Sequence, residues 1–264
     1  MSILDEIVAH KRTELAASPE EEITIASLQA KVAARGGVRD FTAALANPRA
    51  GDVGLIAEVK KASPSAGIIR SDFDPVKIAQ EYEFAGASCI SVLTDEKYFQ
   101  GASTHLQAIR AAVNLPLLRK DFVIDERQIA EAIDWGADAV LLIAAILDDA
   151  KLARFYELAA GSGLSALVEV HDLAELQRAQ AINAPLIGVN NRNLKDFTVD
   201  LGTTESLAAQ MDLEQTLLVS ESGIDSRADV KRLTACGARA ILVGESLLRE
   251  DDIGVKVRSL GGRS

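Results

Sequence analysis

The stretch Gly136-Ala137-Asp138-Ala139-Val140-Leu141-Leu142-Ile143 joins a glycine that can end a helix to five consecutive apolar residues. A continuous apolar run of this length is typical of a strand that is buried on both faces, as in a parallel sheet. In residues 126–137 and 149–163, on either side of the run, apolar residues recur at three- and four-residue steps, as in amphipathic helices. The stretch therefore predicts a buried parallel strand between two helices.

The same unit recurs along the chain. Gly86-Ala87 and Gly237-Ala238 also precede apolar runs, and Asn183-Ala184 takes the corresponding place before another. The three glycines are separated by 50 and 101 residues, which gives about 25 residues for each strand–helix unit. The apolar runs lie at residues 55–59, 89–93, 115–119, 139–143, 166–170, 186–190, 217–221 and 240–244.

Eight strand–helix units indicate an α/β protein with a closed (β/α)8 TIM barrel. An open, doubly wound parallel sheet is the alternative that the pattern leaves open. No linker divides residues 55–264, so we expect residues 1–264 to form a single domain. Residues 1–50 form a predicted helical N-terminal extension, which either caps the barrel or packs beside it.

Composition and charge exclude several classes of function. The 264 residues include 28 Lys and Arg against 39 Asp and Glu, a net charge of -11, which argues against nonspecific nucleic-acid binding. A site for an anionic substrate must then be locally basic. Cys89 and Cys236 lie far apart without metal-ligand spacing, so we expect two reduced thiols and no metal site. Without a secretory signal or an apolar run long enough to span a membrane, the protein is expected to be cytoplasmic.

Polar residues cluster where the predicted strands end. In a parallel barrel the carboxyl ends of the strands form the active site, so these residues are expected to meet at one mouth. They are Glu58, Lys60, Lys120, Glu169, Asn190 and Glu221. A structural salt bridge explains one pair, Glu58 with Lys60, but three carboxylates and two lysines aimed at one mouth favour a catalytic site.

Two glycine turns follow the last two strands, at Ser222-Gly223 and Gly244-Glu245. Glycine permits close approach of the backbone, and the N–H groups at the start of a helix favour a phosphate. The alternative is that both are ordinary strand-to-helix turns. His171, two residues after Glu169, is interpreted as an ordinary loop histidine.

The residues at the strand ends resemble those of one known family. Residues 56–65 (IAEVKKASPS), 91–95 (SVLTD), 118–122 (LRKDF), 167–171 (LVEVH), 188–194 (GVNNRNL) and 220–224 (SESGI) look like indole-3-glycerol phosphate synthase, a (β/α)8 enzyme of tryptophan biosynthesis. The match runs in order over nearly the whole chain. It implies a carboxy-lyase that converts 1-(2-carboxyphenylamino)-1-deoxyribulose 5-phosphate to indole-3-glycerol phosphate, with loss of carbon dioxide and water and without a metal or organic cofactor.

The resemblance also implies roles for individual residues. Lys120 would be the general acid of ring closure, and Glu169 the acid–base group of the later dehydration. Glu58 and Lys60 would form a coupled pair, with Lys60 also reaching the phosphate. The remaining implied site residues are Asn190 for substrate hydroxyls, Arg192 near the aromatic end, Ser63, Glu221 and Ser222 lining the site, and the backbone of Gly223, Gly244 and Glu245 facing the phosphate. An apolar wall for the aromatic ring is expected from Phe99, Phe122 and Leu142.

Three other functions remain as alternatives. Phosphoribosylanthranilate isomerase shares the barrel and the phosphate site, but a Cys base is expected at the end of its first strand, where this chain has Glu58 and Lys60. A Schiff-base aldolase would use Lys120 as its nucleophile. A barrel that only binds a phosphorylated metabolite is the non-enzymatic alternative. The expected partner is a small phosphorylated substrate, with the chain a monomer or weak oligomer; the sequence leaves open whether it associates with other tryptophan-pathway enzymes.

Overall fold

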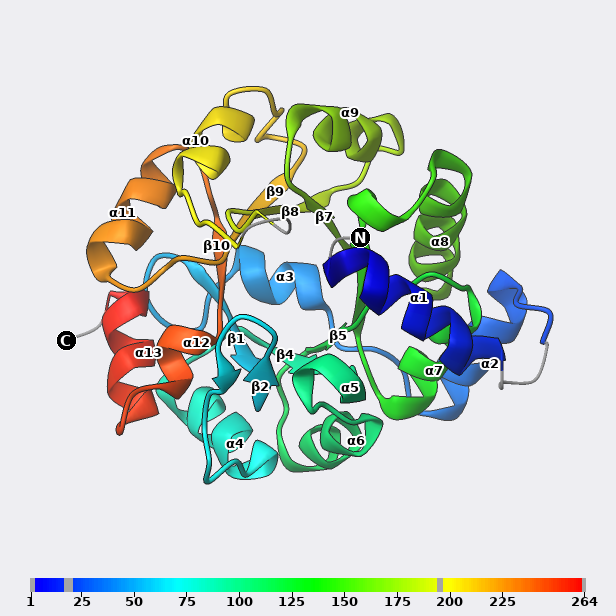
Figure 1. Ribbon diagram of the computed structural model, residues 1–264, viewed down its shortest axis with the longest axis horizontal. Helices are drawn as coiled ribbons and strands as arrows, with labels where there is room; N and C mark the ends of the chain where they lie inside the picture. Colours follow the sequence, from blue (N-terminus) through cyan, green and yellow to red (C-terminus); the bar gives the residue numbers. More distant parts are fainter. Residues whose placement is uncertain (1–2, 17–20, 194–196, 263–264) are drawn as a thin grey trace.

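Eight strands form the centre of the computed structural model, which describes residues 3–16, 21–193 and 197–262. They are β1 (Gly54–Val59), β4 (Cys89–Leu93), β5 (Leu117–Lys120), β6 (Ala139–Ile143), β7 (Ser165–Val170), β8 (Leu186–Asn190), β9 (Leu217–Glu221) and β10 (Ala240–Val243). All are parallel, and they close in the order β1-β10-β9-β8-β7-β6-β5-β4 (Figure 1). The predicted barrel is confirmed, because β1 pairs with both β4 and β10 and so leaves no open edge.

Helices surround this barrel and connect its successive strands. The longer ones are α4 (Pro75–Ala85), α6 (Ser103–Ala112), α7 (Arg127–Trp135), α8 (Asp149–Ser162), α9 (Leu173–Ala181), α10 (Gly202–Ala208), α11 (Arg227–Ala235) and α13 (Ile253–Gly261). Short segments lie in the loops at the carboxyl ends of the strands: the hairpin β2 (Ala62–Ser63) and β3 (Gly67–Ile68), α5 (Glu96–Phe99), η1 (Ala144–Ile146) and α12 (Glu245–Leu248). Along the described ranges, no helix combines the length and apolarity needed to cross a membrane.

The repeated glycines end helices in a conformation that other residues rarely adopt. Gly86, Gly136 and Gly237 have φ angles of +102°, +95° and +103°, and Asn183 has +53° in the corresponding place. Glycine enters this left-handed region without a Cβ clash, and Asn tolerates it better than most residues. The repeat in the sequence is thus a repeated helix stop that turns the chain back into the next strand.

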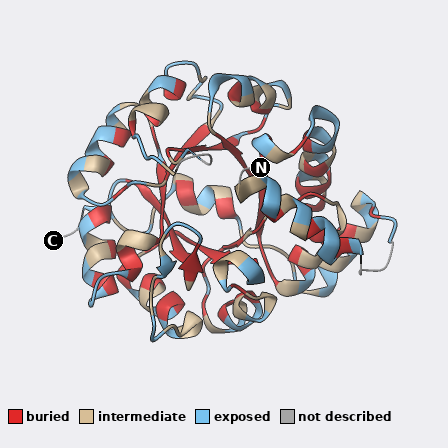
Figure 2. Cartoon of the chain, in the orientation of Figure 1, coloured by how far each residue is buried: buried red, intermediate tan, exposed pale blue. Residues whose placement is uncertain are grey.

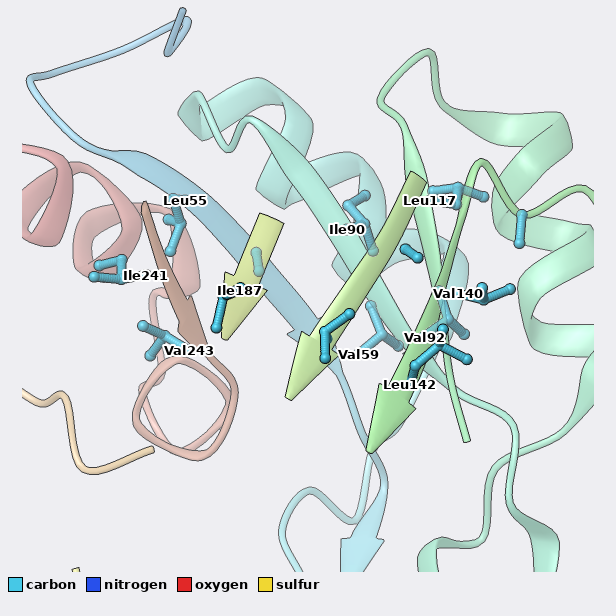
Figure 3. Close-up of a cluster of buried hydrophobic side chains, with 14 of the residues drawn as sticks. Leu55, Val59, Ile90, Val92, Leu117, Val140, Leu142, Ile187, Ile241 and Val243 are labelled. Carbon is cyan, nitrogen blue, oxygen red and sulfur yellow. The ribbon is translucent and has the colours of Figure 1, made fainter. Parts of the chain in front are cut away.

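The apolar side chains form two layers. The outer layer lies between the strands and the surrounding helices and includes Leu55, Val92, Leu142 and Ile241 (Figure 3). The inner layer fills the barrel with side chains such as Leu118 and Leu167. Strands buried on both faces therefore account for the continuous apolar runs (Figure 2).

The N-terminal extension both caps the barrel and packs beside it. Its helices are α1 (Ile3–Ala16), α2 (Ile25–Ala34) and α3 (Phe41–Ala46). In α3, Phe41 and Leu45 are fully buried in the inner layer and close the barrel at the amino ends of the strands. Helix α2 packs against α7 and α8. Helix α1 lies across the opposite end, where the strands finish (Figure 1).

A buried lysine fixes α1 to the barrel rim. The Nζ of Lys11 lies 3.1 Å from a carboxylate oxygen of Asp95 and 3.1 Å from one of Asp121, and it also pairs with Glu14. Burial would lower the pKa of Lys11, but these three carboxylates outweigh burial and hold the pKa above its ordinary value. The contact brings the first helix of the chain to the end of the barrel where the predicted site residues meet.

Candidate active site

A pocket of about 400 Å³ opens at the carboxyl ends of the barrel strands. Its floor carries the charged residues predicted from the strand ends, and Ile3, Leu4 and Ile7 of α1 contribute apolar surface above it. The six residues expected at the mouth, Glu58, Lys60, Lys120, Glu169, Asn190 and Glu221, all line this pocket. The ends of five strands, β1, β5, β7, β8 and β9, thus bring together residues that lie as much as 163 positions apart.

Lys120, the last residue of β5, lies among the buried carboxylates. Its Nζ donates a hydrogen bond of 3.4 Å to Oε2 of Glu169 on β7. Burial would lower the pKa of Lys120, but the negative charges of Glu169, Glu221 and Glu58 outweigh burial and hold the pKa above its ordinary value. At neutral pH the site therefore presents an ammonium group, which can both donate a proton and stabilise negative charge.

Glu169 is surrounded by groups that favour its ionised form. Burial would raise its pKa, but Lys120 and His171 outweigh burial, and the pKa lies well below its ordinary value. The amide Nδ2 of Asn190 donates a hydrogen bond of 3.3 Å to Oε1 of Glu169. A carboxylate with these contacts accepts protons poorly at rest, so a change in its partners during the reaction would alter its strength as a base.

Glu221 has the opposite environment. Burial is the largest cause of its raised pKa, and the neighbouring charge of Glu169 adds to it; together they outweigh Lys120 and raise the pKa of Glu221 to about 8. Its Oε1 is buried and has no hydrogen-bond partner among the residues that the structure describes. Two carboxyl groups at the same mouth thus differ in proton affinity, a pattern typical of acid–base sites.

A glycine in β8 and another directly after β10 make room for two of the carboxylates. A Cβ at Gly188 of β8 would collide with Oε1 of Glu221, and one at Gly244 would collide with Oε1 of Glu58. Glu58 in turn accepts a 2.5 Å hydrogen bond from Nζ of Lys60. Burial would raise the pKa of Glu58, but Lys60 and Lys120 outweigh it and lower that pKa.

The two predicted phosphate turns have different backbones. After β9, Ser222 and Gly223 are both left-handed, with φ angles of +66° and +78°. The Nδ2 of Asn191, a buried residue that our sequence analysis did not single out, donates to the carbonyl oxygens of Glu221 (2.9 Å) and Ser222 (3.2 Å) and so fixes this turn. After β10, Gly244 precedes α12 directly. Backbone N–H groups in turns can form concavities that bind anions.

The side chain of Glu245 is held by a neighbouring arginine. Its Oε1 lies 2.8 Å from Nη2 of Arg249, one helical turn later in the chain. Both residues line the pocket, together with Ser222, Gly223 and Gly244. The negative charge of Glu245 is therefore paired next to the predicted phosphate position, and Arg249 is a rim cation that the sequence analysis did not identify.

One predicted member of the apolar wall is wrong. The rings of Phe99 and Phe122 lie 6.0 Å apart and line the pocket, as expected. Leu142 instead points outward into the layer under the helices (Figure 3). In the pairing of β6 with β7, Ile143 lies opposite Glu169 and Leu142 opposite Val168. Because successive strand residues face opposite sides, Leu141 and Ile143 line the pocket and Leu142 does not.

Ser63 and Arg192 complete the predicted set. Ser63 lies in the β2–β3 hairpin, where its hydroxyl accepts a 3.2 Å hydrogen bond from the backbone N–H of Ala66. The backbone N–H of Arg192 donates a 3.0 Å hydrogen bond to Oδ1 of Asn190. Both residues line the pocket. Leu194, part of the motif that carries the resemblance, lies outside the described residues.

His171 contacts the site residue Glu169 from outside the pocket, although the sequence analysis interpreted it as an ordinary loop histidine. Its Nε2 lies 3.3 Å from Oε1 of Glu169, and its Nδ1 lies 3.0 Å from Oε2 of Glu175. Burial would lower the pKa of His171, but the two carboxylates outweigh burial and raise it to about 10. The signal in the sequence was Glu175, four residues later on the next helix, which fixes the ring.

Comparisons with known proteins identify the family. A model of the indole-3-glycerol phosphate synthase family matches residues 4–260. The indole-3-glycerol phosphate synthases of Laribacter hongkongensis and Leptothrix cholodnii are 49% and 50% identical to the chain over 259 residues, which is 98% of this chain and of each relative. That of Acidithiobacillus ferrooxidans is 52% identical over 248 residues, 94% of each chain.

A solved structure supports the fold alone. Thiamine phosphate pyrophosphorylase from Pyrococcus furiosus superimposes with a TM-score of 0.58 at 16% identity, covering 80% of this chain and 94% of the other. Within residues 3–16, 21–193 and 197–262, no group of three or more His, Cys, Asp or Glu side chains is arranged to hold a metal ion.

The family match and the close relatives show that the chain belongs to the indole-3-glycerol phosphate synthase family, whose members are carboxy-lyases of tryptophan biosynthesis.

Proposed function

We propose that the pocket binds 1-(2-carboxyphenylamino)-1-deoxyribulose 5-phosphate and closes it to indole-3-glycerol phosphate by general acid–base catalysis. The observation that carries this proposal is the partly buried ammonium of Lys120 among three carboxylates. On one side lie the apolar rings of Phe99 and Phe122, and on the other the turn at Gly223. This arrangement suits a substrate with an aromatic end, a reactive carbonyl group and a phosphate.

Lys120 acts as the general acid of ring closure in this proposal. When the new carbon–carbon bond forms, an electron pair moves onto the carbonyl oxygen, which then needs a proton. The ammonium of Lys120 supplies the proton, and its charge stabilises the developing oxyanion in a water-poor pocket. Loss of carbon dioxide then restores the aromatic ring, so this step needs no Schiff base.

Glu169 acts in the dehydration that follows. Removal of water requires that a proton is taken from the ring system and that a proton is given to the departing hydroxyl. A single carboxyl group can do both in turn. Once Lys120 has given up its proton, it no longer opposes protonation of Glu169, so the pKa of that carboxyl rises during the reaction. Glu221, with its raised pKa of about 8, is the second carboxyl group within reach of the same step.

Other residues bind and orient the substrate. Lys60, held by Glu58, balances the charge near Lys120 and reaches toward the phosphate. In this proposal Asn190 orients the hydroxyl groups, Arg192 lies near the aromatic end, and Ser63 also lines the pocket. The N–H groups of the turns at Ser222-Gly223 and Gly244-Glu245 face the phosphate. We further propose that the protein acts in the cytoplasm, as a single-domain monomer or weak oligomer.

A direct assay tests the reaction. Purified protein incubated with the substrate is expected to produce the fluorescence of an indole, without added metal or cofactor. Absence of indole product contradicts the proposal, and binding without turnover indicates a barrel that only binds the metabolite. Borohydride treatment during turnover separates the aldolase alternative, because only a Schiff base at Lys120 is trapped as a covalent adduct.

Calorimetry tests the phosphate site separately. We expect a dephosphorylated substrate analogue to bind much more weakly than the phosphorylated compound, and inorganic phosphate or sulfate to compete with substrate. Replacing Gly223 with Val is expected to weaken phosphate binding, because its φ is +78° and an added Cβ collides with Val199. Equal affinity for the two compounds on the wild-type protein removes the phosphate site from the proposal.

A further inference from the structure

His171 lies behind the active site and outside the residues that line the pocket. It follows β7 directly, and 14% of its side chain is exposed. Its Nε2 is 3.3 Å from Oε1 of Glu169, while Oε2 of the same carboxylate accepts the hydrogen bond of Lys120 on the pocket side. Glu169 is therefore held between a cation that faces the substrate position and a histidine that does not.

A second carboxylate fixes the histidine. Oε2 of Glu175 accepts a 2.8 Å hydrogen bond from the backbone N–H of His171 and lies 3.0 Å from Nδ1 of its ring. Glu175 is itself fixed in the first turn of α9, where its backbone N–H donates a 2.9 Å hydrogen bond to Oδ1 of the N-cap Asp172. The helix start thus sets the position of the imidazole ring.

The surroundings favour a charged ring. Nδ1 of His171 is within hydrogen-bond distance of Glu175, and Nε2 lies 3.3 Å from Oε1 of Glu169 without hydrogen-bond geometry, so two carboxylates flank the ring and stabilise the imidazolium electrostatically. Its charge acts on a site that already contains Lys120 from β5, Glu221 from β9 and Glu58 from β1. It is the cation on the side of Glu169 away from Lys120.

We propose that His171 is a positioning residue: clamped by Glu175, it holds Glu169 in place and keeps the negative charge of the Glu169–Glu221 pair on Glu169. This inference rests on the proposed role of Glu169 in dehydration. Without the imidazolium, the two carboxyl groups become more alike and share a proton, so Glu169 starts each cycle in a mixed protonation state. A role limited to fixing the loop would affect stability and leave the ionisation of the carboxylates unchanged.

The main test compares H171Q with H10Q. Gln keeps an N–H donor near Glu169 but removes the charge. His10 is a matched control because it also pairs with a glutamate four residues later, Glu14, but contacts no residue of the carboxylate pair. We expect H171Q to lower kcat with little change in KM, and to move the acid limb of the kcat–pH profile upward by about one pH unit. H10Q is expected to behave like the wild type.

Two further measurements separate this inference from the proposed function. Titration of 13C-labelled glutamate carboxyl signals, assigned through E169Q and E221Q, requires no turnover; we expect the proton-binding step of the pair near pH 8 to move upward in H171Q. In an E169Q background, H171Q is expected to change kcat by less than about twofold, because His171 acts through Glu169.

E175Q provides a second variant in case H171Q does not fold. It leaves the imidazole in place but removes its outer carboxylate, so we expect the same changes in smaller size. Unchanged titration of the carboxyl pair in H171Q and E175Q overturns the proposal, even if either variant melts at a lower temperature. The proposal is also overturned if the fold-loss of kcat in the double variant H171Q/E169Q equals the product of the losses in the two single variants. Independent sites behave in this way, because their effects add in free energy.

Discussion

A buried carboxylate at one end of the barrel is fully hydrogen-bonded, and one at the other end is not. At the amino ends of the strands, Asp138 accepts hydrogen bonds from the backbone N–H groups of Arg39 (2.8 Å) and Leu117 (3.0 Å) and from the guanidinium of Arg110 (2.6 Å). At the carboxyl ends, Oε1 of Glu221 has no such partner among the described residues. Arg39 belongs to the N-terminal extension, so Asp138 helps to hold that extension to the barrel, whereas Glu221 lines the pocket with one carboxyl oxygen unpaired among the described residues.

The contrast indicates that residues at one end of the barrel mainly stabilise the fold and that residues at the other end mainly serve catalysis. The closed end combines satisfied charges with the buried apolar residues Phe41 and Leu45, so it contributes to folding. The open end gathers like charges that repel one another, at a cost in stability. Substitutions at the two ends should therefore have different signatures, and four variants test this.

The largest expected effect is that of K120M at the open end. Met keeps the length and apolar bulk of Lys120 but removes both the proton and the charge, so we expect kcat to fall by at least about 10³-fold in a protein that still folds. Steady-state kinetics and circular dichroism measure the two quantities. K61M is the control, because Lys61 does not line the pocket. Retention of more than about a tenth of wild-type turnover shows that Lys120 is not the general acid.

At the closed end, D138A is expected to reverse this signature. Removing one partner of a buried charge cluster leaves Arg35 and Arg110 without their carboxylate, and the free energy of unfolding should fall by about 3–5 kcal/mol. The folded fraction should keep wild-type kcat and KM. Denaturant unfolding and kinetics at low temperature check both points, and a large loss of kcat in folded protein would break the comparison.

E169Q is expected to lower kcat by about 100-fold with little effect on KM. Gln preserves the shape of Glu169 and can still hydrogen-bond to Asn190, but it cannot carry a proton. Kinetics at saturating and at low substrate concentration distinguish the two parameters. A rise in KM alone would assign Glu169 to binding and would remove its role in dehydration.

The smallest expected effect is that of E221Q, whose stability should depend on pH differently from that of the wild type. The pKa of Glu221 is raised from 4.5 to about 8 in the folded protein, so its protonated form contributes stability below pH 4.5 that is lost as pH rises toward 8. Gln does not ionise, so E221Q does not lose this stability. The difference in Tm between E221Q and the wild type should therefore increase from pH 4.5 to pH 8, and the Tm of E221Q should be the higher one at pH 9. A flat difference for E221Q would show that Glu221 is not a strained carboxyl group.

The barrel itself was predictable because each strand is continuous in sequence. The apolar runs at residues 89–93, 139–143, 186–190 and 217–221 coincide with β4, β6, β8 and β9. The glycine before a run marks the end of a helix, and that signal is local. The strand ends followed from the same reasoning, and the six charged and polar residues named there meet in one pocket.

The features that the sequence did not predict depend on contacts between strands or between a helix and a loop. The run at residues 139–143 is apolar on both faces, so nothing within it distinguishes the inward Leu141 from the outward Leu142; only pairing with β7 does. His171 is not distinguished from a loop histidine until α9 begins close enough for Glu175 to reach it. The placement of α1 above the pocket required the contacts of Lys11 with Asp95 and Asp121, which are more than 80 residues away in sequence.

Gly188 and Gly244 have no side chain to offer a substrate, yet each leaves the space that a neighbouring catalytic-site carboxylate occupies. Any replacement at Gly188 moves the carboxylate of Glu221, and any replacement at Gly244 moves that of Glu58. In a redesign of this barrel, the segment with the glycine and the neighbouring strand with the carboxylate have to be changed together, because the carboxylate needs the space that the glycine leaves.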